Sequence, residues 1–284
     1  MTQLKLIFIF ISLFTLFVSK AASQTNDSVR ENSLDSVTIR AYRYTSSVKR
    51  HQDGSQTWNV NMLKDLPKIL GNADPIRYVQ MLPGIQSNSE YKSGVNIQGC
   101  ENSHNSLLLE DVPIYNVNHL LGFFSAFNAT HFSKMSVEKN STYKSALNQL
   151  GGSVTMHHDN KQPSSIDGEL TLGMISSQGT LKFPLSAKTK LTISARQSYL
   201  NLIYDKMMAS DDDYLNYSFG DYNLTLYHQI SPDNTLQIDY YGGYDFAKFG
   251  EDRLSANLKA NWGNQMASIQ WQYGKKNFRR IRFS

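Results

Sequence analysis

ADPIRYVQMLPGIQ, residues 73–86, opens the stretch of sequence that decides the fold; GVNIQG follows at 94–99 and LLLEDVPIYNVNHLLG at 107–122. The first phrase predicts a short helix, because Asp74 is a natural N-cap and Pro75 suits the first helical position. Apolar residues then share one helix face, and a Pro-Gly pair ends the helix. These residues are Ile76, Val79, Leu82, Pro83 and Gly84.

Short strands are expected around this helix, between Trp58 and Asn160. Apolar and β-branched runs alternate there with Gly, Asn, Asp and Pro, a pattern typical of strands joined by turns. The expected strands are 95–97, 107–109, 135–137 and 154–156. The sequence therefore predicts a small α+β unit.

After Pro163, apolar and polar residues alternate strictly, which predicts antiparallel strands. The apolar positions fall into seven groups: Leu170 to Met174, Leu181 to Leu185, Leu191 to Ala195, Leu224 to Leu226, Leu236 to Tyr240, Leu254 to Trp262 and Ala267 to Tyr273. Polar residues fill the intervening positions, as the wet lumen of an outer-membrane β-barrel favours. A soluble β-sandwich alternates in the same way, so alternation alone leaves both architectures open.

The first residues form a targeting signal. Lys5 precedes a mostly apolar run from Leu6 to Val18, and small residues follow at Ala21, Ala22 and Ser23. This run is shorter than the roughly 20 residues that a membrane-spanning helix needs, which favours a cleaved signal peptide over an anchor. The net charge is 28 minus 24, or +4, and removal of Lys5 and Lys20 leaves +2. A charge this small argues against a nucleic-acid partner.

Several residues are of types found in disulfides, metal sites or catalytic sites, but their number or spacing does not support such sites. The single cysteine, Cys100, excludes an internal disulfide and multi-cysteine metal sites. Adjacent strand residues point to opposite faces, so we expect His157-His158-Asp159 to be a solvated strand end and not a metal site. Asp211-Asp212-Asp213 lacks the spacing of a calcium loop and reads as a solvated acidic loop. The familiar catalytic motifs are missing, and we predict no enzyme, no metal and no cofactor.

The phrases in residues 73–122, and LGGSVTM at 150–156, resemble the plug domain of TonB-dependent outer-membrane receptors. RQSYL at 196–200 and WGN at 262–264 resemble phrases early in the barrel of that family. The resemblance implies an α+β plug domain followed by antiparallel strands of an incomplete outer-membrane β-barrel. It places the plug motif on Asp74, Pro75, Leu82, Pro83, Gly84, Gly99, Asp111, Pro113, Gly122, Gly151 and Gly152.

In this family a short N-terminal segment, the TonB box, recruits the inner-membrane protein TonB. The candidate residues are Asp35, Ser36, Val37, Thr38, Ile39, Arg40 and Ala41. An extended peptide that adds itself to a sheet edge carries a pull through main-chain hydrogen bonds. The alternative is that these residues form an ordinary first strand of the plug.

Two positions depart from the family pattern. Gln98-Gly99-Cys100 stands where Arg-Gly-Gly is usual, which removes an ion pair expected between plug and barrel wall. Glu110-Asp111 stands where an Asp-Gly turn is usual, so Asp111 has to adopt a turn conformation that glycine adopts more easily.

Length is the larger departure, because a barrel of about 22 strands would need roughly 250 or more further residues. An open sheet edge in lipid would leave backbone groups unsatisfied, and we therefore expect a truncated receptor. The tail from Gly274 to Ser284 adds five cations and is either frameshifted sequence or a basic loop.

The predicted organisation is a signal peptide at 1–23, a flexible arm with the candidate TonB box at 24–57, the plug at 58–162 and a partial barrel at 163–284. The resemblance implies a receptor that imports a scarce or large ligand with energy from TonB, and plug loops 87–93 and 100–106 that face the ligand. Outer-membrane lipid and a surface lipoprotein are further candidate partners. The alternative is a secreted binding module, an α+β domain with a β-sandwich, for a glycan or peptide.

Overall fold

The computed structural model describes residues 48–52, 54–60, 68, 70–87, 89, 93–115, 117–139, 150–161, 163–207, 213–251, 256–274 and 279–283. All of them belong to one compact unit, residues 44–284. The predicted signal peptide, the candidate TonB box Asp35–Ala41 and the first two residues of the acidic run at 211–213 lie outside the described residues.

Within the described residues, six strands form a mixed sheet in the order β1-β2-β9-β10-β5-β6. Their bounds are β1 Val48–Arg50, β2 Gln56–Asn59, β5 Ser106–Leu109, β6 Val112–Pro113, β9 Lys134–Glu138 and β10 Ser153–His157. β10 pairs in parallel with β5, and the other neighbours are antiparallel. β1 and the first residues of β2 lie within the range that we assigned to the N-terminal arm.

Two small hairpins and short helices complete the mixed-sheet region, residues 48–161. The hairpins pair β3 (Ile85–Gln86) with β4 (Asn96–Ile97) and β7 (Asn118–His119) with β8 (Phe124–Ser125). The helices are α2 (Pro75–Val79) and the 3₁₀ turns η3 (Asn102–His104) and η4 (Leu120–Gly122). The strands predicted at 95–97, 107–109, 135–137 and 154–156 are confirmed as β4, β5, β9 and β10.

Helix α2 begins as the sequence predicts. One carboxylate oxygen of Asp74 accepts the N–H of Ile76 at 2.9 Å and that of Arg77 at 3.4 Å. Its other oxygen accepts the N–H of Ser125 at 2.7 Å, which ties the helix start to β8. Ile76 and Val79 are fully buried, so the predicted apolar face is the core-facing side of α2.

The turn between β5 and β6 has the conformation expected from the sequence. Glu110 and Asp111 have φ values of 45° and 66°, and Leu109 pairs directly with Val112. Two successive left-handed residues make a type I′ hairpin turn. Residues other than glycine adopt this backbone conformation at a steric cost.

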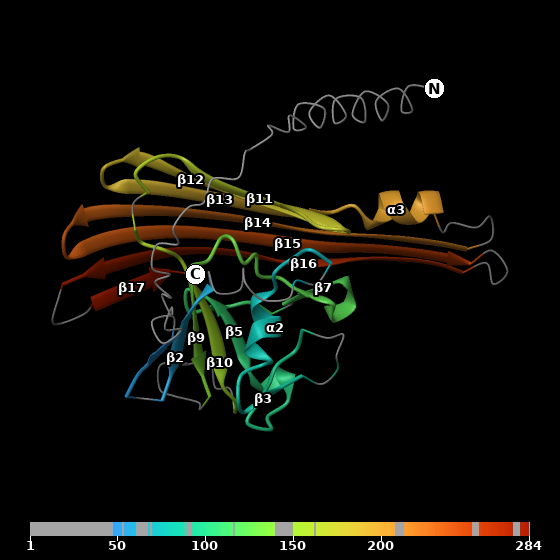
Figure 1. Cartoon of the computed structure of the whole chain (residues 1–284), viewed down its shortest axis with the longest axis horizontal. Coiled ribbons are helices and arrows are strands. Elements are labelled where there is room, and N and C mark those ends of the chain that lie inside the picture. The colour runs from blue at the N-terminus through green and yellow to red at the C-terminus, as the bar shows by residue number, and fades with distance from the viewer. Residues whose placement is uncertain are drawn as a thin grey trace, which may run out of the picture. The chain divides into compact units, whose positions relative to one another are not determined.

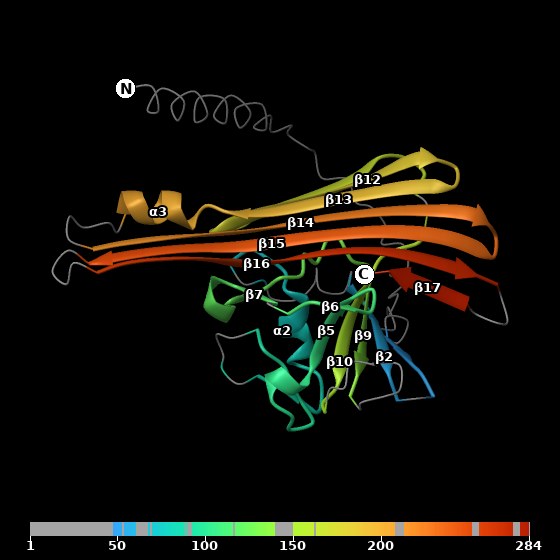
Figure 2. The ribbon, with the colours of Figure 1, turned by 180° about the vertical axis from the view of Figure 1, so that it is seen from behind.

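Seven described strands form the large sheet, in which each strand is antiparallel to the next along the chain. They are β11 Asp167–Leu172, β12 Ser176–Ser186, β13 Thr189–Ser198, β14 Asp213–Ser231, β15 Asn234–Glu251, β16 Ala256–Tyr273 and β17 Arg279–Phe283. Helix α3, Leu200–Met207, lies between β13 and β14 (Figure 1). Figure 2 shows the same strands from behind, with β14, β15 and β16 the longest.

The strand assignment near the C-terminus differs from the prediction. The two groups around Trp262 and Trp271 belong to one strand, β16, and the seventh strand, β17, lies in the basic tail that we read as a loop or frameshift. Gly263 lies inside this strand, and a Cβ there would lie 2.1 Å from the carbonyl oxygen of Gly243. This glycine permits close approach of β15 inside a continuous strand. No helix among the described residues is long and apolar enough to cross a membrane.

Candidate functional site

The large sheet buries its polar face and exposes its apolar face. Its buried polar residues are Ser176, Gln178, Thr180, Lys190, Thr192, Ser194, Arg196, Ser198, Asp221, Asn223, Thr225, Gln237, Asp239, Asp245, Ser268 and Gln270. Its exposed large apolar residues are Leu170, Leu172, Leu181, Leu185, Ile193, Tyr222, Ile230, Tyr240, Leu258, Ile269, Trp271 and Tyr273. A water-soluble sheet has the opposite arrangement, since apolar burial drives its folding.

The register of the strands makes this inversion continuous across the sheet. Thr192 pairs with Thr225, Thr225 with Asp239, and Asp239 with Ser268, which forms a polar row on the buried face. One residue along, Ile193 pairs with Leu181 and Leu224 on the opposite face. The predicted pattern of apolar positions with polar residues between them is thus confirmed, and the polar side faces the mixed-sheet region.

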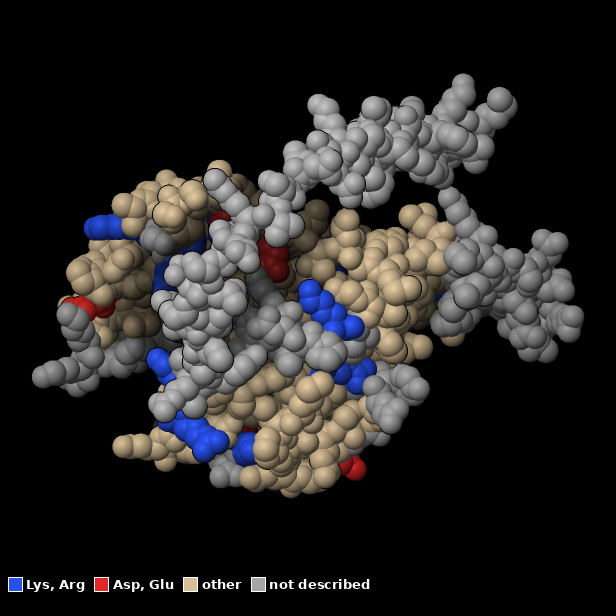
Figure 3. All heavy atoms as spheres, viewed as in Figure 1, with Lys and Arg blue, Asp and Glu red and all other residues tan. Residues whose placement is uncertain are grey.

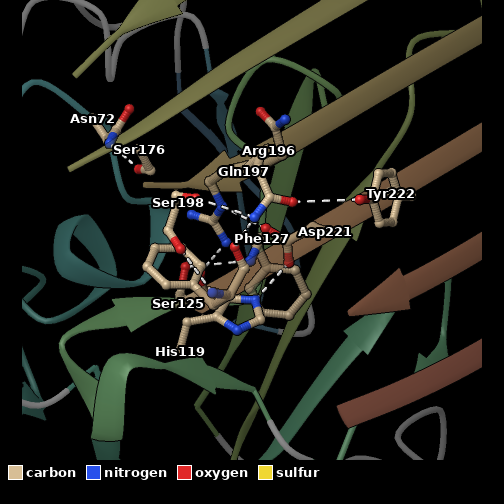
Figure 4. Close-up of polar contacts among 12 residues, drawn as sticks. Asn72, His119, Ser125, Phe127, Ser176, Arg196, Gln197, Ser198, Asp221 and Tyr222 are labelled. Atoms are coloured by element: carbon tan, nitrogen blue, oxygen red, sulfur yellow. Dashed lines mark hydrogen bonds and ion pairs between the residues drawn. The ribbon is translucent and has the colours of Figure 1, made fainter. Parts of the chain in front are cut away.

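A buried histidine on β7, His119, connects the mixed-sheet region to the large sheet. The Nδ1 atom of His119 lies 2.7 Å from a carboxylate oxygen of Asp245 on β15. Its Nε2 atom lies 2.7 Å from a carboxylate oxygen of Asp221 on β14 (Figure 4). The ring stacks on Phe219 with 5.0 Å between centroids, and both carboxylates are fully buried. We call His119, Asp221 and Asp245 the histidine clasp.

The environment of the clasp favours the charged form of the histidine. Burial alone lowers the pKa of His119, but the negative charge of Asp221 and the hydrogen bonds to both carboxylates outweigh it and raise the pKa to about 8. A nearby guanidinium, that of Arg196, opposes this effect in part. At neutral pH the imidazolium therefore bridges two strands of the large sheet.

Arg196 on β13 extends this network. Its Nε donates to the second carboxylate oxygen of Asp221, and its Nη2 donates to the carbonyl oxygen of Ser125 on β8 at 2.6 Å (Figure 4). The guanidinium also lies 5.7 Å from the ring centroid of Phe219. Two cations and two carboxylates thus balance one another in a buried site, which is the condition under which buried charges are tolerated.

A second histidine cluster corrects our reading of residues 157–159. The side chain of His158 is buried, and its Nε2 lies 3.0 Å from a carboxylate oxygen of Asp239 on β15. His131 contacts Thr225 at 3.1 Å and Ser194 at 2.9 Å. The expected solvated strand end is therefore wrong for His158, because the chain end of β10 runs against the polar face of the large sheet and not into water. Among the described residues, no group of three or more His, Cys, Asp or Glu side chains is placed to hold a metal ion.

The two histidines of this cluster differ in charge preference. Burial lowers the pKa of His131 well below its ordinary value, and the neighbouring charge on His158 lowers it further. Burial also lowers the pKa of His158, but the charge and hydrogen bond of Asp239 outweigh this effect and raise it. His131 is accordingly a neutral hydrogen-bonding group, and His158 pairs with Asp239.

Glu110, in the turn between β5 and β6, contacts this cluster from within the mixed-sheet region. It is 6% exposed although it lies in a hairpin turn. Its carboxylate accepts the N–H of His158 at 2.7 Å and lies 3.2 Å from Nδ1 of His157. Burial raises the pKa of Glu110, but the hydrogen bond from His157 and the charges of both histidines dominate and lower it to about 2.

The predicted plug-motif residues lie in the mixed-sheet region, and two of them, Asp74 and Gly122, lie near the clasp residues. Asp74 caps α2 and Pro75 is its first residue. Leu82, which follows the helix, is buried. The glycines Gly84, Gly99 and Gly122 have φ values of 78°, 82° and 105°. Pro83 follows α2, Asp111 lies in the β5–β6 turn, and Pro113 ends β6.

Gly151 and Gly152 precede β10, as expected. A Cβ on Gly151 would lie 2.0 Å from the side-chain oxygen of Asn105, and one on Gly152 would lie 2.3 Å from the carbonyl oxygen of Glu138. The same Asn105 oxygen accepts the N–H of Gly152 at 2.9 Å. These glycines are therefore required for close packing.

The clasp residues were not singled out from the sequence. His119 and Arg196 occur inside the phrases that carry the resemblance, but no sequence rule pairs a residue on β7 with acids more than 100 positions later. The sequence feature that could have indicated these residues is the alternation of apolar and polar positions, because it puts the polar residues Arg196, Asp221 and Asp245 on one face of the large sheet. An ion pair between the mixed-sheet region and the large sheet is nevertheless present, between His119 and the two aspartates.

Two cavities lie beside the second histidine cluster. A cavity of about 190 Å³ is lined by Glu110, Lys134, His157, His158, Asn160, Tyr227, Thr235, Gln237, Gln270 and Gln272. A wider groove of about 700 Å³ adjoins it, lined by Lys49, His51, Thr57, Trp58, Asn59, Ser133, Lys134, Ser136, His157, Asp159, Asn160 and Lys161. Basic side chains are prominent on the face drawn in Figure 3. The loops expected to face a ligand are 87–93 and 100–106, and none of their described residues lines either cavity.

No protein-family model and no curated protein matches the sequence. Solved structures match in fold. The ferric enterobactin receptor of Pseudomonas aeruginosa is 11% identical over 78% of this chain and 38% of its own, with a TM-score of 0.53. The transporter YddB of Escherichia coli is 11% identical over 79% of this chain and 37% of its own, with a TM-score of 0.55.

A third match is FpvA of P. aeruginosa in complex with pyoverdine, 14% identical over 81% of this chain and 33% of its own, with a TM-score of 0.53. The chain thus spans well under half the length of these structures. They are TonB-dependent outer-membrane receptors, and the chain shares the fold of the part that it covers.

Proposed function

We propose that the chain is part of a TonB-dependent outer-membrane receptor that imports a ligand too large or too scarce for porins. The observation that carries this proposal is the inverted polarity of the large sheet, whose apolar side chains point outward from every strand between β11 and β16. Lipid is the solvent in which such a face is stable. The shared fold with outer-membrane receptors supports the same reading.

The strand connections fit an outer-membrane orientation. At one end of the sheet, the connections β12–β13, β14–β15 and β16–β17 have two, two and five residues. At the other end, β11–β12 and β15–β16 are joined by three and four residues, and the connection from β13 to β14 has 14 residues and contains α3. Outer-membrane barrels have short turns on the periplasmic side and longer loops outside the cell. We therefore assign the short-turn end to the periplasm.

We assign residues 58–162 as the plug and residues 163–284 as barrel wall. Residues 1–23 are assigned as the signal peptide and 24–57 as the arm that carries the TonB box, Asp35–Ala41, and the last part of this arm pairs with the plug's sheet through β1 and β2. The polar contact between the mixed-sheet region and the large sheet, which we call the seam, supports this division. Hydrogen-bonded surfaces separate and rejoin more readily than apolar cores do.

The rival function, a secreted α+β and β-sandwich module, requires that the sheet bury its apolar face against a second sheet. The buried face instead carries Thr192, Thr225 and Asp239 in one row. The outward residues Leu170 and Leu172 are more than 70% exposed. An apolar surface of this kind is unstable in water.

Membrane fractionation tests the location. After export in a Gram-negative host, the chain should stay in the outer-membrane pellet through washes with alkaline carbonate and with urea, and should enter solution with detergent. Recovery of folded, soluble protein from the periplasm without detergent would refute the membrane assignment and favour the secreted module.

A second experiment tests the TonB contact. Val37→Pro removes a backbone donor from the middle of the candidate box and should abolish capture by the purified C-terminal domain of TonB. Val29→Pro makes the same change outside the box and should leave capture intact. Equal capture of both variants would show that Asp35–Ala41 is not the contact.

A further inference from the structure

The turn between β7 and β8 has an unfavourable backbone. Leu120, Leu121 and Gly122 have φ values of 51°, 55° and 105°, so three successive residues are left-handed. Glycine accepts this conformation, whereas leucine adopts it at a steric cost. Leu121 is 72% exposed and gains little from packing. Contacts elsewhere must therefore keep the turn in this form.

The contacts that hold the turn come largely from the large sheet. The N–H of Leu120 donates to Asp245 on β15 at 3.2 Å. The preceding residue is His119, whose ring bonds both Asp245 and Asp221. On the other side, the carbonyl oxygen of Gly122 accepts the N–H of Ser93 at 2.7 Å. The clasp and the strained turn are thus adjacent parts of one structure.

The geometry of the clasp requires a doubly protonated ring. An ionised carboxylate only accepts hydrogen bonds, and each ring nitrogen of His119 lies 2.7 Å from a carboxylate oxygen. A neutral imidazole has one N–H, so its other nitrogen would present a lone pair to a buried anion. Loss of the proton would also leave two carboxylates facing one cation, Arg196, in a site without water contact.

We propose that His119 is a proton-operated clasp: its imidazolium holds the left-handed turn of the mixed-sheet region against β14 and β15, and loss of one proton releases the turn. Release removes the hydrogen bonds to Asp221 and Asp245, and Leu120 and Leu121 then relax to ordinary backbone angles. The inference concerns a contact inside the chain and holds whatever ligand is transported.

The charged and titratable groups that the structure places around the clasp come from four elements. They are Arg196 on β13, Tyr217 and Asp221 on β14, Tyr241 and Asp245 on β15, and Asp74 before α2. Of the side-chain types in the clasp and around it, histidine is the one whose ordinary pKa lies in the range from pH 6 to pH 9.5.

The sign and size of the effect follow from the pKa. His119 titrates at its ordinary 6.5 when the turn is released and at about 8 when the clasp is closed. Protonation of His119 therefore stabilises the closed clasp fully below pH 6.5, and this stabilisation is lost as the pH rises through 8. The two values imply that the equilibrium shifts toward release by roughly twentyfold between pH 6 and pH 9.5.

Hydrogen exchange on the full chain in detergent measures this release directly. Peptides covering residues 118–125 should lose amide protection by roughly twentyfold between pH 6 and pH 9.5, after correction for the intrinsic exchange rate. The strand amides of β14 and β15 should keep theirs. Unchanged protection of 118–125 in the wild type would overturn the proposal without any variant.

Three variants assign the effect to the ring. His119→Gln should lower the protection of 118–125 at pH 6 and abolish its dependence on pH. His119→Lys keeps a cation to about pH 10 and should retain protection at pH 9.5. His131→Gln alters another buried histidine at the same seam and should preserve the wild-type response. A wild-type response in His119→Gln would refute the clasp.

Discussion

Neutralising Glu110 should weaken the mixed-sheet region in a manner that depends on pH. The pKa of this carboxyl falls from an ordinary 4.5 to about 2 in the folded chain. A difference of about 2.5 corresponds to about 3 kcal/mol of stability at neutral pH, since each pKa unit is about 1.4 kcal/mol. Because the folded pKa is the lower one, this stability is present above pH 4.5 and is lost as the pH falls toward 2.

The assay is urea unfolding in detergent, followed by tryptophan fluorescence at pH 7 and pH 3. The advantage of the wild type over Glu110→Gln should shrink by about 2 kcal/mol between these values, which is the part of the linkage lost by pH 3. Asp111→Asn is the matched control, because it makes the same chemical change at the exposed neighbour in the same turn. A wild-type advantage that is the same at both pH values would refute the reasoning.

Two further outcomes are expected. Ile193→Arg puts a charge on the outward face and should reduce the stability of the lipid-inserted fold by about 2–4 kcal/mol, measured by urea titration in lipid vesicles; Ile193→Ala is the control, and an equal effect of both would contradict a lipid-facing position. Gly152→Ala would put a Cβ 2.3 Å from the carbonyl of Glu138 and should cost about 1–3 kcal/mol in thermal unfolding. Gly179→Ala meets its nearest atom at 3.6 Å and should be close to neutral.

Features set by neighbouring residues could be predicted from the sequence. The Asp74 cap, the apolar face of α2 and the left-handed Asp111 each depend on a few successive residues, and each is confirmed. The phase of the alternation also predicted which side of the large sheet is apolar. It did not say which side meets the mixed-sheet region, because lipid and a protein core select the same side chains.

Features set by distant contacts could not be predicted. His158 was expected in water, and its partner Asp239 lies on a strand more than 80 positions later. The groups around Trp262 and Trp271 were predicted as two strands, because the sequence does not show that residues 256–273 pair continuously with β15. The clasp shows the same limit, since His119 acquires its role from acids on two later strands.

The chemistry of the seam explains why these distant contacts are ionic. The inward positions of the large sheet cannot be uniformly apolar if the mixed-sheet region is to separate from it, because an apolar interface of this extent would be permanent. Unpaired polar groups would be equally unsuitable, since each carries a desolvation cost. Pairing of a buried cation with a carboxylate satisfies both conditions, and the structure shows it in two places: His119 and Arg196 match Asp221 and Asp245, and His158 matches Asp239. Contacts of this kind hold only at the right geometry and protonation, so the loss of one proton from His119 breaks its own contacts with Asp221 and Asp245 while His158 and Asp239 stay paired.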